Sequence, residues 1–257
     1  MASVFEIEKL NFSYGDNHVI RDLSVNISEG KITTLIGANG CGKSTLFNLM
    51  TKNLRIAGGT IKLGGEDIHS IKLRDFAKRV AIVHQYNTAP DDISVEKLVG
   101  YGRTPHRGFG MPGNSDEDEQ KIALAMQITN TEKFKDKAVS QLSGGQKQRV
   151  WIAMALAQDT KILFLDEPTT YLDIRYQLEI LRLVKRLKNE YNITVVMVLH
   201  DINQSLYYSD EIIAMKDGAI IAQGEPEQVI SEDLIKSVYG VDLRLTEVDG
   251  KPFVLPV

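Results

Sequence analysis

The chain has 257 residues, of which 43% are apolar and 25% are charged, a composition typical of a folded protein with a sizeable core. A formal net charge of -4 argues against general nucleic-acid binding, which usually needs a basic excess. Cys41 is the one cysteine, so an internal disulfide is excluded and a reducing compartment is favoured. The longest apolar run, residues 193–199, is too short to cross a membrane, so any membrane-spanning part would come from another chain.

Strands and helices are predicted in an alternating order. Residues 1–30 read as short strands joined by a turn at 15–17. The later expected elements are, in chain order, a strand at 31–36, a helix at 44–53, strands at 60–63 and 80–83, helices at 95–101, 117–129 and 146–158, a strand at 161–165, a helix at 174–190, a strand at 193–199 and a hairpin around 216–218. Because the strands lack polar alternation, helices should cover both faces of a mostly parallel sheet in an α/β fold.

The character of the sequence changes after Gln85. Residues 86–140 hold two helical stretches on either side of a loop rich in proline and glycine, which reads as a helical insertion and not as part of a sheet. An acidic run at 116–119 lies at the start of the second helix. Since acids stabilise the first turn of a helix, we favour a helix start over a cation site there.

A glycine-rich loop carries the strongest chemical signal. Residues 37–44 read Gly-Ala-Asn-Gly-Cys-Gly-Lys-Ser and follow the G-x-x-x-x-G-K-[ST] pattern of a phosphate-binding loop. The glycines allow backbone N–H groups to surround phosphate oxygens, Lys43 supplies a charge to the β- and γ-phosphates, and Ser44 offers a hydroxyl to Mg²⁺. The predicted ATP-binding residues of this segment are Gly37, Asn39, Gly40, Cys41, Gly42, Lys43, Ser44 and Thr45.

Cys41 lies inside this loop, next to a helix N-terminus and near Lys43. This setting favours an accessible, reactive thiol whose alkylation would block the phosphate site. The alternative is a small residue buried against the preceding strand, which would be inert.

An apolar strand at 161–165 ends in two carboxylates. A phosphate-binding loop is expected to work with an acid at a strand end that holds Mg²⁺, and Asp166 fits this role. Glu167 follows directly, so its side chain points elsewhere and is a candidate for polarising the attacking water.

A second helix start also resembles a phosphate-binding element. Residues 141–146 read Gln-Leu-Ser-Gly-Gly-Gln before a predicted helix, with Ser143 as a natural N-cap and two glycines that permit close backbone approach. Simple capping is the alternative. Two such sites with one phosphate-binding loop suggest that one of them serves the nucleotide of a partner chain.

With these motifs in order, the sequence resembles the nucleotide-binding subunits of ATP-binding cassette (ABC) transporters over nearly its whole length. The resemblance implies that Tyr14 stacks on adenine, that the loop 171–173 with Asp173 crosses a dimer interface, and that His200 contacts the γ-phosphate. It also implies a catalytic group of Glu167, His200, Gln85 and Asp173, a Mg²⁺ site of Ser44, Gln85 and Asp166, and a signature motif that binds the partner's ATP through Leu142, Ser143, Gly144, Gly145 and Gln146.

The same resemblance implies an architecture and an assembly. The expected fold is a P-loop NTPase with a mostly parallel sheet core and an N-terminal antiparallel β subdomain at about 1–85 and 141–257, and a helical subdomain at about 86–140. The expected assembly is a head-to-tail homodimer with ATP and Mg²⁺. It would sit at the cytoplasmic face of the membrane on two permease subunits, with an extracytoplasmic substrate-binding protein as an indirect partner.

A separate chain with a single cassette favours an importer. The stretches 102–106, 151–159, 200–204 and 238–241 are similar to those of ferric-siderophore and vitamin B12 importer subunits, and we favour iron-chelate uptake. The alternatives are an importer motor for cobalamin, haem or a metal ion, an exporter motor with a separate permease chain, and a non-transport ABC ATPase.

Overall fold

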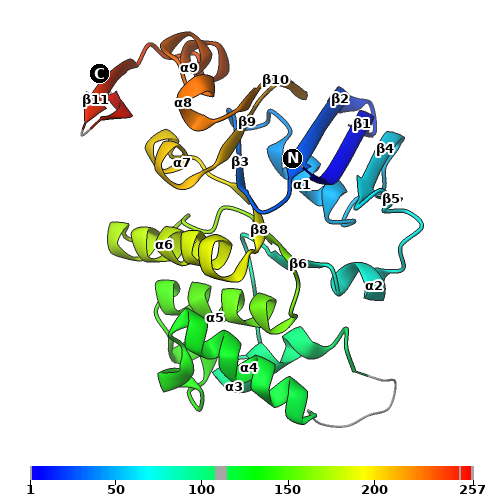
Figure 1. Cartoon of the computed structure of the whole chain (residues 1–257), viewed down its shortest axis with the longest axis vertical. Coiled ribbons are helices and arrows are strands. Elements are labelled where there is room, and N and C mark those ends of the chain that lie inside the picture. The colour runs from blue at the N-terminus through cyan, green and yellow to red at the C-terminus, as the bar shows by residue number, and fades with distance from the viewer. Residues whose placement is uncertain (1, 108–114, 249, 256–257) are drawn as a thin grey trace. The chain divides into compact units, whose positions relative to one another are not determined.

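The computed structural model describes residues 2–107, 115–248 and 250–255. The chain forms two compact units, one of residues 1–71 and 194–257 and one of residues 72–193 (Figure 1). The first unit thus combines the two ends of the chain, and the second is a continuous segment.

The first unit begins with an antiparallel sheet. Its strand order is β2-β1-β4-β5, formed by β1 (Ser3–Tyr14), β2 (Asn17–Ser28), β4 (Gly58–Leu63) and β5 (Glu66–Asp67). Phe5, Ile7 and Leu10 of β1 are buried, and charged side chains such as Glu8 are exposed. This mixture fits a sheet with one face against the core.

A second set of strands in this unit is mostly parallel. The order is β10-β9-β3-β8, from β3 (Ile32–Ile36), β8 (Thr194–Val198), β9 (Glu211–Lys216) and β10 (Ala219–Gly224). β3 pairs in parallel with β8 and β9, and all residues of β3 and β8 are buried. The remaining elements are α1 (Lys43–Met50), α7 (Ile202–Tyr208), α8 (Pro226–Val229), α9 (Glu232–Tyr239) and the antiparallel hairpin of β11 (Arg244–Val248) and β12 (Lys251–Leu255).

The second unit is mainly helical around one parallel strand pair, β6 (Val80–Val83) and β7 (Ile162–Leu165). Its other elements are α2 (Leu73–Ala77), α3 (Val95–Gly100), η1 (Tyr101–Arg103), α4 (Asp116–Thr129), η2 (Glu132–Phe134), η3 (Val139–Gln141), α5 (Gly144–Ala157) and α6 (Ile174–Tyr191). Helices α3, α4 and α5 form one group (Figure 1). α6 has a clear apolar face, with Ile180, Val184 and Leu187 fully buried.

These observations confirm the predicted α/β class with parallel strands, the antiparallel N-terminal strands and the hairpin at 216–218. The acidic run 116–119 is a helix start as predicted: Ser115 and Asp118 form a reciprocal capping box at α4. Most of the loop expected between the two helical stretches, residues 108–114, lies outside the described residues. The proposed boundaries of a helical subdomain at 86 and 140 stay a prediction.

The stretch 102–106, which carried part of the family resemblance, is a packing element of the second unit. A Cβ on Gly102 would lie 2.1 Å from the carbonyl oxygen of Met154, so glycine is needed for close contact with α5. Arg103 is 2% exposed and donates to a carboxylate oxygen of Asp118 at 2.7 Å and to the carbonyl of Ala157 at 2.9 Å. The stretch therefore joins α4 to α5.

Asp118 is held in its charged form by this pairing. Burial alone would raise the pKa of Asp118, but the hydrogen bond from Arg103, the capping bond at Ser115 and the charges of Arg103 and Arg107 together lower the pKa below its usual value. The resulting stabilisation is present above the unfolded-state pKa and is lost as the pH falls through the lower folded-state pKa.

We therefore expect Asp118→Asn to lower the free energy of unfolding at pH 7 by about 3 kcal/mol, because it leaves the buried Arg103 without its main counter-charge. Asp116→Asn is the matched control, since it removes a carboxylate from the same helical turn at an exposed position. The measurement is urea unfolding between pH 3 and pH 7, where the difference between the two variants should shrink at the acid end. Equal stability of the two variants at pH 7 would show that the pair does not stabilise the unit.

Candidate active site

The predicted site residues fall into two groups, one in each unit. In the first unit, the loop between β3 and α1 is built from glycines with backbone angles that other residues rarely adopt: φ is 153° at Gly37, 80° at Gly40 and 107° at Gly42. A Cβ on Gly37 would lie 2.5 Å from both Cys41 Sγ and the carbonyl oxygen of Met215. The loop is thus packed closely against β9, which fixes the course of its backbone.

Lys43 begins α1 and is 5% exposed. Its ammonium donates to the carbonyl oxygens of Gly37 at 2.8 Å and Ala38 at 3.0 Å, so the side chain folds back over the loop. Ser44 is exposed beside it, and Thr45 is buried. The loop therefore brings an ammonium and a hydroxyl together at a helix N-terminus, which is chemistry suited to binding polyphosphate.

Cys41 differs from the accessible thiol that we expected. The residue is 5% exposed, and its sulfur lies 3.9 Å from Lys43 Nζ. The same sulfur lies so near Gly37 that a Cβ there would be only 2.5 Å away. The alternative, a small residue buried in the loop, is the observed one. Reactivity depends on access as well as on charge, so the folded protein should protect this thiol.

Tyr14 and His200 are the other predicted residues of the first unit. Tyr14 ends β1, is 51% exposed and packs edge-on against Phe12, with ring centroids 4.9 Å apart. An exposed ring held by a second ring suits stacking on a planar base. His200 is exposed and follows Leu199, whose N–H bonds to Leu35 at the end of β3.

In the second unit, two strand ends bring polar groups together. β6 and β7 pair in parallel with Val83 beside Leu165, so the residues after both strands lie at the same edge. The amide of Gln85 donates to a carboxylate oxygen of Glu167 at 2.6 Å, and Thr170 Oγ1 donates to the same oxygen at 3.1 Å. The predicted catalytic glutamine and glutamate are thus in direct contact.

Glu167 also has a strained backbone. Its φ is 49°, in the left-handed region that costs a non-glycine residue about 1–3 kcal/mol and is concentrated at functional sites. This conformation turns the chain immediately after Asp166.

A tyrosine pair at this edge was missed by sequence reasoning. Tyr86 follows Gln85, and Tyr171 lies in the loop after Glu167; their hydroxyls are 3.1 Å apart and their ring centroids 6.3 Å apart. The hydrogen bond between the two hydroxyls raises the pKa of Tyr86. The pair joins the same two loops as Gln85 and Glu167. Each tyrosine lies beside a predicted site residue, but the sequence carries no signal that the two would meet.

The segment 142–146 forms the N-terminus of α5. Ser143 caps the helix by accepting from Gln146 N–H, and the side chain of Gln146 accepts from Ser143 N–H at 3.0 Å. A Cβ on Gly145 would lie 2.3 Å from the Tyr176 ring, so glycine is required by packing against α6. Ser143 and Gly144 are exposed, whereas Leu142 is buried. Asp173 similarly caps α6 by accepting from Tyr176 N–H.

The predicted metal ligands are Ser44 in the first unit and Gln85 and Asp166 in the second. All offer oxygen atoms, as Mg²⁺ prefers, and Mg²⁺ usually combines few protein ligands with phosphate oxygens. The amide nitrogen of Gln85 is used by Glu167, which leaves its oxygen as the atom that could face a cation. The donor set therefore fits Mg²⁺. Within the described residues, no group of three or more His, Cys, Asp or Glu could hold a metal by itself.

A phosphate-binding loop after a parallel strand, with a carboxylate pair at a second strand end, defines a P-loop nucleotide hydrolase. Residues 20–170 match the ABC transporter family model. The chain is 46% identical to the iron(3+)-hydroxamate import ATP-binding protein FhuC of Bacillus subtilis over 93% of this chain and 88% of that protein. It is 41% identical to the ferric enterobactin transport ATP-binding protein FepC of Escherichia coli over 97% and 93%.

Solved structures agree. The ATP-binding cassette MJ0796, in a dimeric post-hydrolysis state with ADP and phosphate, superposes with a TM-score of 0.74 at 27% identity, over 86% of this chain and 98% of that one. CbiO1 of Clostridium perfringens, part of an ABC transporter complex, gives 0.79 at 32% identity, over 92% and 94%. The chain belongs to the ABC transporter family and is an ATPase that uses ATP and Mg²⁺.

We expect the Cys41 thiol to react slowly with maleimide in the native protein, at a rate set by opening of the loop, and rapidly in denaturant. Mass spectrometry of labelled protein over time measures both rates, and Cys41→Ala is the control for labelling at other groups. Immediate complete labelling of the native protein would contradict the buried position.

Proposed function

We propose that this chain is the ATPase subunit of an importer for iron(III) chelates of the siderophore type, working as a dimer at the cytoplasmic face of a membrane. The observation that carries the proposal is high identity over nearly the whole length with ATP-binding proteins named for import of ferric hydroxamate and enterobactin. Within the described residues, no helix has the length and apolar character needed to cross a bilayer. The transport path would then belong to two permease subunits supplied by a substrate-binding protein outside the membrane.

Two copies arranged head to tail would enclose two nucleotides. The loop 37–45 and Tyr14 of one copy would hold ATP, and Ser143 and Gly144 of the other copy would approach its γ-phosphate. The exposure of Ser143 and Gly144 supports this assignment, because their own helix start is already capped internally and their outer surfaces are available. Asp173, at the start of α6, would lie near the same interface.

Hydrolysis would use the polar edge after β6 and β7. Asp166 and Gln85, with Ser44, would hold Mg²⁺, which neutralises phosphate charge when bound. Glu167, positioned by Gln85 and Thr170, would accept a proton from the attacking water, and His200 would contact the γ-phosphate. Since Gln85 contacts Glu167 directly, movement of the chain after Gln85 would alter the position of the base.

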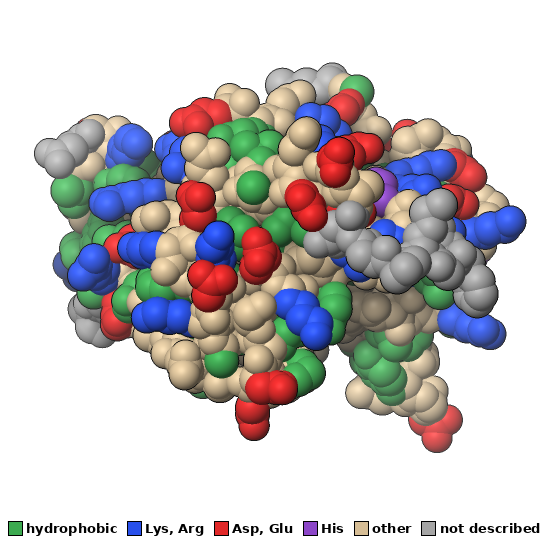
Figure 2. Space-filling model, turned by 90° about the horizontal axis from the view of Figure 1, so that it is seen from below, with side chains coloured by type: hydrophobic (Ala, Val, Ile, Leu, Met, Phe, Trp, Pro, Cys, Tyr) green, Lys and Arg blue, Asp and Glu red, His purple; other side chains and the backbone are tan. Residues whose placement is uncertain are grey.

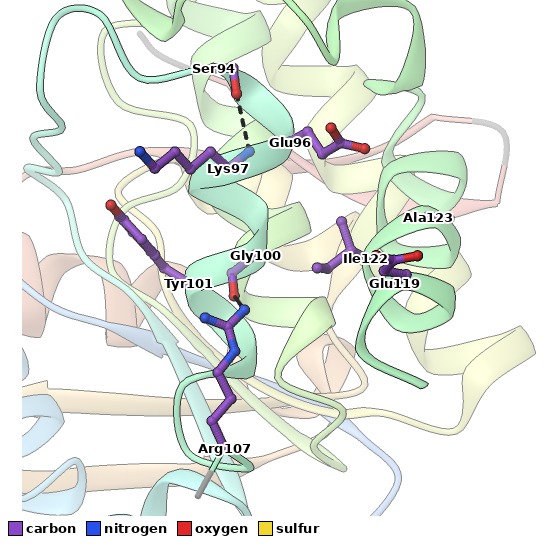
Figure 3. Close-up of a pocket in the computed structure, with 9 residues that line it drawn as sticks. All are labelled: Ser94, Glu96, Lys97, Gly100, Tyr101, Arg107, Glu119, Ile122 and Ala123. Carbon is purple, nitrogen blue, oxygen red and sulfur yellow. Dashed lines mark hydrogen bonds between the residues drawn. The ribbon is translucent and has the colours of Figure 1, made fainter. Parts of the chain in front are cut away.

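The coupling surface is proposed at residues 86–105, where a cytoplasmic helix of the permease would dock. A groove of about 610 Å³ lies there between α3 and α4 (Figure 3). Lys97 and Tyr101 lie on one side of α3, Glu96 lies on the side facing α4, and Arg107 donates to the carbonyl of Gly100. Side chains of both charges and an aromatic ring line this groove, so a permease helix docked there would be held by ion pairs and by contact with Tyr101.

Other functions have weaker support. The motor does not contact the cargo, so importers of cobalamin, haem or metal ions remain alternatives within this function, and an exporter motor with a separate permease is a further one. For a nucleic-acid remodelling ATPase, a basic face would be expected. Figure 2 instead shows acidic and basic side chains intermingled over the described residues of the face that carries α3 and α4.

The test combines hydrolysis and uptake. Glu167→Gln should keep ATP binding and lower turnover by roughly 10²-fold, as loss of a general base does. In cells that lack the native gene, the wild-type chain should restore uptake of ⁵⁵Fe-loaded hydroxamate or catecholate siderophore, and Glu167→Gln should not. Labelled cobalamin and haem serve as cargo controls. Restoration of cobalamin uptake alone would overturn the cargo assignment, and wild-type turnover in Glu167→Gln would overturn the role of Glu167.

A further inference from the structure

The C-terminal hairpin of the first unit is attached to α7 by an unusual hydrogen-bond pair. The side-chain nitrogen of Asn203 donates to the carbonyl oxygen of Val254 at 3.0 Å, and the N–H of Val254 donates to the side-chain oxygen of Asn203 at 2.8 Å. The Asn203 amide thus pairs with the backbone of β12 in the way that a neighbouring β-strand would. Asparagine suits this position because its short side chain carries one donor group and one acceptor.

Two further contacts hold β12 in the same place. Lys251 Nζ lies 5.1 Å from the centroid of the Tyr207 ring, one helical turn beyond Asn203 on α7. Val254 is 3% exposed and packs in a cluster with Ile36 and Leu206. The hairpin formed by β11 and β12, at the C-terminal end of the chain in Figure 1, is therefore joined to this core through Val254.

Helix α7 depends on such support. It has seven residues, a length at which a helix is marginal without tertiary contacts. Its start is fixed by Asp201, whose side chain accepts from Gln204 N–H at 2.8 Å. His200 immediately precedes this cap, so the place of the histidine depends on where α7 is docked.

The same C-terminal segment reaches the phosphate-binding loop. Tyr239, near the end of α9, packs on the cluster that contains Ile36, the residue before Gly37. Burial raises the pKa of Tyr239 to about 12. Tyr239 of α9 thus lies on the core next to the phosphate-binding loop, whereas β12 is bonded to the helix that follows His200.

We propose that Asn203 is a positioning residue for ATP hydrolysis: by clamping β12 to α7 it fixes the start of that helix and hence the His200 imidazole against the γ-phosphate. The inference rests on the proposed role of His200. It assigns a function in catalysis to the C-terminal hairpin, which contributes no residue to the nucleotide site. Loosening of the clamp should affect the chemical step more than nucleotide binding, because the binding loop is held separately by its glycine packing.

The test is Asn203→Leu, which removes both hydrogen bonds while keeping a side chain of similar size. We expect kcat to fall roughly tenfold, since small misplacements of catalytic groups have effects of this order or larger, with KM for ATP changed less than about twofold. Asn26→Leu is the matched control. Asn26 lies exposed on β2 and contributes its backbone carbonyl to a hydrogen bond, so this variant should behave as wild type.

Asn203→Asp is a second variant. It retains the oxygen that accepts from Val254 N–H but loses the donor and places a carboxylate oxygen against the Val254 carbonyl, so its kcat should fall in the same direction. Circular dichroism and hydrogen exchange separate loss of folding from loss of position: the expected result is faster exchange within residues 199–208 in an otherwise folded protein.

A double-mutant cycle with His200→Ala identifies the route of the effect. If Asn203 acts through His200, then Asn203→Leu should produce no further loss in the His200→Ala protein. A full additional tenfold loss there, or an unchanged kcat in Asn203→Leu alone, would overturn the inference. Wild-type turnover in His200→Ala itself would instead overturn the proposed role of His200 and, with it, any action of Asn203 through that residue.

Discussion

The proposed hydrolytic site of this protein depends on the hydrogen bond between Gln85 and Glu167. This bond arises because β6 and β7 are parallel and in register, so that the residues following both strands come to the same edge. A carboxylate held by an amide and by the Thr170 hydroxyl has few orientations available, which is the preorganisation a general base requires. The left-handed backbone at Glu167 adds strain that the surrounding contacts must offset.

The same bond links the segment that leads to the proposed docking groove with Glu167, the proposed general base. Gln85 is the first residue of the segment that leads into α3, and the Tyr86–Tyr171 contact joins that segment to the loop after Glu167 a second time. A displacement of residues 86–105 by a permease helix would therefore be passed to Glu167 through Gln85 and to the loop after Glu167 through Tyr86. In the first unit the contacts are of another type. The phosphate-binding loop is held by close backbone packing at its glycines, and the chain after His200 is held by a hydrogen bond to the C-terminal hairpin.

Sequence patterns indicated which residues form the motifs, but not the long-range contacts that hold those residues in place. Residues 37–44 and 161–167 were recognisable because phosphate binding and metal binding demand particular residue types at fixed spacing, and apolar runs predicted the parallel strands around them. The burial of Cys41 was not predictable from charge alone, because it follows from the close approach of Gly37 to Met215, far along the chain. The Asn203–Val254 and Tyr86–Tyr171 contacts are likewise long-range, and the short helices α7, α8 and α9 lack the length that makes periodicity readable.

We propose that the phosphate-binding loop of one copy and the signature segment of another share one nucleotide. Cross-linking tests this arrangement in a Cys41→Ala, Glu167→Gln background, in which copies that carry Asn39→Cys are mixed with differently tagged copies that carry Ser143→Cys. Both positions are exposed. We expect a short thiol cross-linker to join the two kinds of copy when ATP is present and to leave them separate without it. Equal cross-linking with and without ATP, or no product with ATP bound, would contradict a nucleotide site shared between copies.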